Sequence, residues 1–168
     1  MLAGSWSERP GAAIMQLTVM DRNHHGWNTV LYVEDSADDF ALLELAARKC
    51  GTPFFLQRAA DGEEAIAYLN GASSYADRDA HPFPDLVLLD LKMPPLDGFE
   101  VLQWIRDNPV TRALPVVVLA GSRFRADIRR ALELGAQSYA AKPGTLAELE
   151  VLVEQIAKVW LAREKIPG

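Results

Sequence analysis

The stretch PDLVLLDLKMPPLDG, residues 84–98, decides the fold of this chain. Its apolar run at residues 86–89 has proline on both sides, which is typical of a short strand buried on both faces. Asp90 follows directly, at the carboxyl end of that strand. In a parallel α/β sheet, ligands bind outside the carboxyl ends of the strands. The position of Asp90 therefore favours a chemical role over a packing role.

Two further apolar runs end in charged residues. Residues 29–33 lead to Glu34 and Asp35. Residues 138–141 lead to Lys142, which a proline follows. If these strands are parallel, the charged side chains meet Asp90 at one edge of the sheet. Carboxylates held close together resist ionisation unless cations compensate them. A hard divalent metal ion and one lysine would provide that compensation.

The composition limits the classes of protein to consider. The 168 residues suit one domain with some excess, and an apolar content of 49% is enough for a sizeable core. No apolar run approaches the roughly 20 residues that cross a bilayer, so we expect a cytoplasmic protein without membrane contact. The net charge of −6 argues against general nucleic-acid binding. The single cysteine, Cys50, excludes an internal disulfide and fits a small buried apolar position.

Predicted strands and helices alternate between residues 28 and 163, which we expect to form one domain. The predicted strands are residues 29–33, 54–58, 86–89, 114–119 and 138–141. A helix is predicted after each strand; the fourth covers residues 124–134, and the last begins at Thr145 and has Val159 on its apolar face. This alternation predicts a parallel sheet covered by helices on both faces. Residues 1–27 are expected to be a flexible leader, and residues 164–168 a short tail.

Four motifs occur in an order and spacing that resemble one known family. They are VEDS at residues 33–36, LDLKMP at 89–94, DG at 97–98 and KP at 142–143. The region from residue 28 to 162 resembles the receiver domain of two-component response regulators. Residues 75–78 and 98–102 are similar to those of small stand-alone receivers that partner bacterial phytochrome-type and other sensor kinases. The resemblance implies a doubly wound, flavodoxin-like α/β fold with five parallel strands in the order 2-1-3-4-5.

The resemblance also implies a role for each strand-end residue. Asp90 would accept a phosphoryl group from a phosphohistidine on a sensor histidine kinase or a histidine phosphotransfer protein. Mg²⁺ would be held by Glu34, Asp35 and Asp90, together with the backbone carbonyl of Lys92. Lys142 would pair with the phosphoryl oxygens and offset their charge during in-line transfer. In this family the peptide bond that follows this lysine is cis.

Ala120 departs from the family pattern. Receivers carry Ser or Thr at the end of the fourth strand, where the hydroxyl donates to the phosphoryl group and lets an aromatic residue, here Tyr139, turn inward. Ala120 lacks that donor, a loss of roughly 1.5–3 kcal/mol, so we expect phosphorylation to survive better than switching. The backbone N–H of Gly121 remains as a donor. That Ser122 supplies a substitute hydroxyl is a hypothesis.

Other charged and aromatic residues have ordinary explanations. The four arginines of residues 123–130 make a basic face, for which a solvated surface is the default and a partner or self-association surface is the alternative. Trp104 and Trp160 are expected to pack in the core. A homodimer contact through the last helix is the alternative for Trp160.

Three functions compete on this evidence. The first is a single-domain response regulator that signals through protein contacts and catalyses only its own phosphorylation and dephosphorylation. The second is a receiver-like module that binds its partner without phosphorylation, which Ala120 favours. The third is a Mg²⁺-dependent phosphatase or phosphotransferase. It is disfavoured because such enzymes usually carry an acid two residues after the nucleophile, where this chain has Lys92. Few residues follow the last helix, so no DNA-binding module is expected, and the downstream target is not identified.

Overall fold

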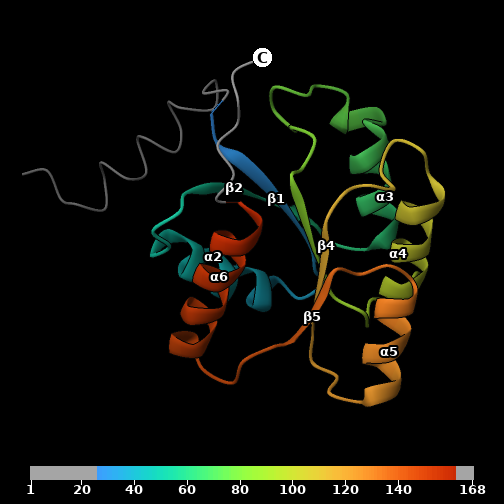
Figure 1. Ribbon diagram of the computed structural model, residues 1–168. Helices are drawn as coiled ribbons and strands as arrows, with labels where there is room; N and C mark the ends of the chain where they lie inside the picture. The colour runs from blue at the N-terminus through green and yellow to red at the C-terminus, as the bar shows by residue number, and fades with distance from the viewer. Residues whose placement is uncertain (1–25, 162–168) are drawn as a thin grey trace, which may run out of the picture.

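The computed structural model describes residues 26–161, which form a five-stranded sheet with helices on both faces (Figure 1). The strands are β1 (Asn28–Val33), β2 (Phe54–Ala59), β3 (Leu86–Leu89), β4 (Val116–Ala120) and β5 (Ser138–Ala141). The helices are α2 (Ala37–Arg48), α3 (Gly62–Asn70), α4 (Gly98–Asp107), α5 (Arg125–Glu133) and α6 (Leu146–Trp160), with a 3₁₀ turn η1 (Ser73–Tyr75). Within this range no helix has the length and apolar character needed to cross a membrane. Most of the expected leader, residues 1–25, and the expected tail lie outside the described residues.

The sheet is parallel throughout, with the strand order β2-β1-β3-β4-β5. Val33 at the end of β1 pairs with Ala59 and with Leu89, and Leu89 pairs in turn with Val118. The carboxyl ends of β1 and β3 therefore lie level with each other. The strand order reverses direction between these two strands, which is where ligands bind in such sheets. The predicted fold class and strand order are confirmed.

Alternate residues of the central strands belong to two separate cores. In β3, Val87 and Leu89 join the apolar cluster that includes residues of α3, α4 and α5. Leu86 and Leu88 join the cluster that includes residues of α2 and α6. Figure 1 shows these two groups of helices on opposite faces of the sheet. Because successive strand side chains point to opposite faces, a strand covered on both faces needs an unbroken apolar run.

Side-chain caps start the helices next to the strand ends. Ser36 accepts a hydrogen bond from the backbone N–H of Asp39 at 3.2 Å and so begins α2. Asp97 begins α4 with a capping box, in which Asp97 and Glu100 each accept from the other's backbone N–H at 2.9 Å. These caps satisfy N–H groups that have no partner inside the helix. Both helices are thereby positioned to start beside the acidic edge of the sheet.

The structure corrects two predicted boundaries and one predicted core position. The fourth strand spans Val116–Ala120 and starts two residues later than predicted, because Pro115 has no N–H for the ladder. α5 begins at Arg125, and Phe124 precedes it with 71% of its surface exposed. Val159 is 64% exposed, so its predicted place on the core face was wrong. The core face of α6 has its buried residues at 153, 156 and 157.

The packing expected for the two tryptophans is confirmed. Trp104 is partly buried against the cluster under α3, α4 and α5. Trp160 and Cys50 are partly buried against the cluster under α2 and α6. Cys50 is therefore less enclosed than predicted, although burial still raises the pKa of its thiol.

Candidate functional site

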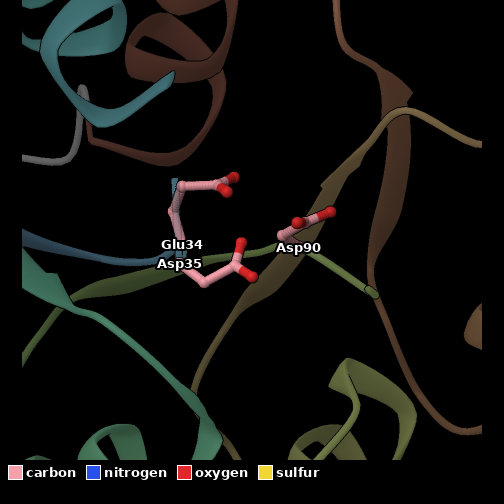
Figure 2. A group of neighbouring side chains, drawn as sticks. All are labelled: Glu34, Asp35 and Asp90. Carbon is pink, nitrogen blue, oxygen red and sulfur yellow. The ribbon is translucent and has the colours of Figure 1, made fainter. Parts of the chain in front are cut away.

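Three carboxylates from two strand ends meet at one edge of the sheet (Figure 2). Glu34 and Asp35 follow β1, and Asp90 follows β3. One oxygen atom from each lies within 4.8 Å of the others. Glu34 is 1% exposed and Asp90 is 6% exposed, whereas Asp35 is open to solvent. The backbone N–H of Asp90 donates to the Val33 carbonyl at 3.1 Å, which holds the two strand ends together.

Glu34 is almost fully buried, and its carboxylate accepts hydrogen bonds from three donors. Its Oε2 accepts from the Tyr32 hydroxyl at 3.0 Å and from Lys142 Nζ at 2.7 Å, and its Oε1 accepts from the backbone N–H of Ser36 at 3.1 Å. Burial raises the pKa of Glu34, and the hydrogen bonds from Lys142 and Ser36 oppose that shift. The donors therefore stabilise a carboxylate that burial alone would disfavour.

Asp90 has fewer partners than Glu34. Its Oδ1 accepts from the backbone N–H of Leu91 at 2.9 Å, and its Oδ2 lies 3.6 Å from Lys142 Nζ. Burial raises the pKa of Asp90, and the charge of Asp35 adds to the rise. The charge of Lys142 and the backbone N–H of Leu91 act in the opposite direction. Asp90 is thus a buried acid whose charge is only partly compensated.

Lys142 brings a cation to the acidic edge from β5. Its backbone N–H donates to the Ala120 carbonyl at 2.8 Å, which extends the pairing of β4 and β5. Its Nζ lies 2.7 Å from Glu34 Oε2, 2.7 Å from Asp39 Oδ2 and 3.6 Å from Asp90 Oδ2. Burial lowers the pKa of Lys142, but its hydrogen bonds to Asp39 and Glu34 outweigh burial and leave the pKa above its ordinary value. Among the described residues the cis peptide bond is Pro94–Pro95, so the cis bond expected after Lys142 was wrong.

Sequence reasoning missed three residues that support this site. Asp39, in the first turn of α2, binds Lys142 at 2.7 Å. Tyr32 binds Glu34, and Arg58 donates to the carbonyl of Glu34 at 3.1 Å. Strand alternation could have predicted the contact between Tyr32 and Glu34, because residues two apart on a strand share a face. Arg58 and Asp39 gave no such signal, because their contacts depend on how β2 and α2 pack.

Near the end of β4, the hydroxyl groups of Ser122 and Tyr139 make hydrogen bonds within the surrounding loop and helix and not to Asp90. Ala120 is buried, and Gly121 is exposed. The Ser122 hydroxyl donates to Asp127 Oδ2 at 2.5 Å and accepts from the backbone N–H of Phe124 at 3.3 Å. The Tyr139 hydroxyl donates to the Ser122 carbonyl at 2.7 Å. These contacts tie the loop between β4 and α5 to both α5 and β5.

The donor set suits a hard divalent cation. Carboxylate oxygens are the ligands that Mg²⁺, Mn²⁺ and Ca²⁺ prefer, and Mg²⁺ usually keeps several waters beside one or two protein carboxylates. The exposed Asp35 leaves the group open on one side to solvent, whereas Glu34 and Asp90 are buried. Lys92, whose carbonyl was expected to contribute, lies two residues beyond Asp90 with an exposed side chain. The residues present therefore fit such an ion.

Comparisons with known proteins agree with this geometry. Residues 30–154 match the family model of the response regulator receiver domain. The response regulator Rcp1 from Synechocystis is 35% identical over 139 residues, which make up 83% of this chain and 92% of Rcp1.

Two solved structures share the fold along nearly their whole length. The phosphorylated cyanobacterial phytochrome response regulator RcpA is 34% identical and has a TM-score of 0.75, covering 84% of this chain and 99% of RcpA. The Mn²⁺-bound form of Rcp1 is also 34% identical and has a TM-score of 0.73, with the same coverage. Receiver domains bind a divalent metal ion and receive a phosphoryl group from a partner kinase. This chain, with its parallel sheet, its three acids at one edge and Lys142 after β5, belongs to the response regulator receiver domain family of two-component signalling.

Proposed function

We propose that this chain is a single-domain response regulator that accepts a phosphoryl group on Asp90. The donor would be a phosphohistidine on a sensor histidine kinase or a histidine phosphotransfer protein. The observation that carries this proposal is the position of Asp90, buried at a strand end, beside two further acids and 3.6 Å from Lys142. The likeness to Rcp1 and RcpA supports a phytochrome-type kinase as the donor.

The transfer step needs little machinery beyond these residues. An oxygen of Asp90 forms a bond to phosphorus, the P–N bond to the donor imidazole breaks, and its electron pair stays on the imidazole nitrogen. The ammonium of Lys142 offsets charge on the phosphoryl oxygens. In dephosphorylation, water attacks phosphorus, the P–O bond to Asp90 breaks, and the carboxylate leaves with the electron pair. The protons of the water remain on phosphate or pass to solvent.

We assign the metal site to Glu34, Asp35 and Asp90, with the carbonyl of Lys92 as a further ligand. Mg²⁺ is the proposed ion, and when bound it supplies positive charge that offsets the charge of the phosphoryl oxygens. Burial of Glu34 and Asp90 excludes much of the competing water, which strengthens electrostatic interactions within the site. Lys142 would complete the charge balance from the β5 side.

The remaining proposals concern the context in which the site works. The receiver domain would span residues 28–163, between a leader and a short tail, and would act in the cytoplasm. Its output would pass through protein contacts and not through nucleic acid or a membrane. The exposed arginines of residues 123–130 and the α6 surface around Trp160 are the places we assign to a downstream protein or a second copy of the chain.

The test of this proposal is Mg²⁺-dependent phosphorylation by phosphoramidate or acetyl phosphate, followed by intact mass. We expect one phosphoryl adduct on the wild type and none on Asp90→Asn. Asp107→Asn, at the opposite end of α4 from the site, is the matched control and should keep the adduct. Chelation of Mg²⁺ should prevent its formation. An adduct on Asp90→Asn would place the acceptor elsewhere and contradict the proposal.

A second candidate function is binding of a partner without phosphorylation. It is favoured by Ala120, which has no hydroxyl to donate. It is also favoured by the Tyr139 hydroxyl, which donates to the Ser122 carbonyl, and by the Ser122 hydroxyl, which donates to Asp127. Tryptophan fluorescence and oligomer size, recorded during the same phosphorylation experiment, separate the two functions. A change on phosphorylation supports a switch, whereas no adduct despite Mg²⁺ binding supports the constitutive module.

A further inference from the structure

The ammonium group of Lys142 is shared unequally among three carboxylates. It makes hydrogen bonds of 2.7 Å to Glu34 and 2.7 Å to Asp39, whereas Asp90 Oδ2 lies 3.6 Å away. Asp39 stands in the first turn of α2 and is outside the group of acids that could hold a metal ion. The lysine is therefore drawn toward a helix and not fully toward the proposed phosphoacceptor.

The two strong contacts of Lys142 differ in how firmly the acid is held. Glu34 is 1% exposed and also accepts from Tyr32 and Ser36, so releasing the lysine from it would leave a buried carboxylate less compensated. The Asp39 side chain is 40% exposed, so water can replace the lysine there at low cost. The contact between Asp39 and Lys142 is consequently the easier one to break.

A phosphoryl group on Asp90 would increase the demand for positive charge at this edge. An aspartyl phosphate carries roughly 2 negative charges near neutral pH, about one more than the carboxylate that it replaces, and it extends that charge further from the strand end. Ala120 offers no side-chain donor, and the Ser122 and Tyr139 hydroxyls are already committed to Asp127 and the Ser122 carbonyl. Lys142, 3.6 Å from Asp90, is thus a cationic side chain in position to respond, and Asp39 competes for it.

We propose that Asp39 is a positioning residue. It holds Lys142 away from Asp90 until a phosphoryl group on Asp90 replaces Asp39 as the partner of Lys142. The first turn of α2 would then report phosphorylation, in place of the hydroxyl that Ala120 lacks. This inference rests on phosphorylation of Asp90. Because the carboxylate of Asp39 competes for the ammonium that the transfer step uses, removing it should speed phosphorylation.

The test compares Asp39→Asn with Asp38→Asn. Asp38 lies one residue earlier in the same helical turn and is exposed, so both changes remove one negative charge near the helix start. The measurement is the initial rate of phosphorylation by phosphoramidate with Mg²⁺, followed by intact mass. We expect Asp39→Asn to raise the rate by about 2- to 5-fold, within the range that loss of one partly exposed ion pair produces, and Asp38→Asn to leave it near the wild-type rate.

A double-mutant cycle distinguishes positioning from a general structural effect. In a Lys142→Gln background, which we expect to be slow, Asp39→Asn should leave the rate unchanged, because no ammonium remains to be released. A structural effect of Asp39 would change the rate in both backgrounds. Thermal unfolding of each variant checks that it is folded. Backbone amide NMR shifts at the start of α2 should move on phosphorylation of the wild type and move much less in Asp39→Asn.

The outcomes separate this inference from the proposed function. If the wild type is phosphorylated and the two aspartate variants have equal rates, or Asp39→Asn is slower, the role of Asp39 is wrong while the proposed function stands. An equal effect of Asp39→Asn in both lysine backgrounds would also overturn it. If the wild type takes no phosphoryl group on Asp90, both proposals fail.

Discussion

The ionised carboxylate of Asp90 costs the folded protein free energy, because burial raises its pKa despite the nearby charge of Lys142. The unfolded chain does not pay this cost, since there the carboxylate is in water. Above the folded-state pKa the cost is fully present, and it disappears as the pH falls below the unfolded value. A reactive acid is thus kept at this position at the expense of stability.

Replacing Asp90 with asparagine should therefore stabilise the protein at neutral pH, by about 1 kcal/mol. The amide oxygen can still accept from the Leu91 N–H, so little packing is lost. Urea unfolding near pH 7 should show the gain, and the gain should shrink as the pH approaches 4. Asp107→Asn, on the exposed end of α4, should show no such gain. A loss of stability in Asp90→Asn at neutral pH would contradict this account.

Lys142 has the opposite effect on stability, because it compensates Glu34, which is 1% exposed. Lys142→Met removes the cation and leaves that buried carboxylate with the neutral donors Tyr32 and Ser36. We expect a loss of about 2–4 kcal/mol in the free energy of unfolding, measured by urea denaturation at neutral pH. Lys158→Met, which breaks an exposed pair with Glu154, is the control and should change it by less than about 1 kcal/mol.

At the scale of the secondary-structure elements, the start of α4 packs tightly against the backbone that follows β3. Its first residue, Gly98, donates its N–H to the Leu91 carbonyl at 2.8 Å. A Cβ added at Gly98 would stand 2.1 Å from the Asp90 carbonyl oxygen and 2.7 Å from Leu91 Cα. Backbone atoms cannot move aside as a flexible side chain can, so the helix packs on the strand end only with glycine here.

Gly98→Ala should therefore displace either α4 or the backbone of Asp90. We expect a loss of about 2–3 kcal/mol in the free energy of unfolding and slower phosphorylation of Asp90, because the acceptor is moved. The measurements are urea denaturation and intact mass after phosphoramidate treatment. A Cβ added at Gly144 meets no atom within 4 Å, so Gly144→Ala should leave the stability nearly unchanged. Equal stabilities of the two variants would show that the strand end is more pliable than inferred.

At the scale of the whole molecule, the parallel sheet gathers distant parts of the chain at one edge. The contact between Lys142 and Glu34 joins residues 108 positions apart in the sequence, and the metal-site acids come from β1 and β3. A ligand at this edge binds only the folded chain, because unfolding separates its parts. Binding should consequently stabilise the entire domain.

Mg²⁺ should raise the thermal unfolding midpoint, and the rise should continue logarithmically with Mg²⁺ concentration once the site is nearly saturated. At a concentration ten times the dissociation constant, the stabilisation is about 1.4 kcal/mol, which corresponds to a few degrees for a domain of this size. Asp35→Asn should abolish most of this rise, and because Asp35 is exposed the apo protein should remain folded. NaCl at equal ionic strength is the control. A rise that persists in Asp35→Asn would place the ion elsewhere.

Local sequence patterns determined the strands, the two-sided burial of β3 and the charged residues at the strand ends, because strand periodicity and chain breaks are properties of a few neighbouring residues. The meeting of the three acids followed from the parallel arrangement, since parallel strands place their carboxyl ends together, whereas the Lys92 carbonyl as a metal ligand came from the family resemblance. The strand order came from the family resemblance. Only the tertiary structure decided that Lys142 donates to Asp39 as well as to Glu34. It also decided that Arg58 donates to the Glu34 carbonyl and that the Ser122 hydroxyl donates to Asp127. These contacts depend on how whole helices and strands pack and rotate against one another, which no short stretch of sequence encodes.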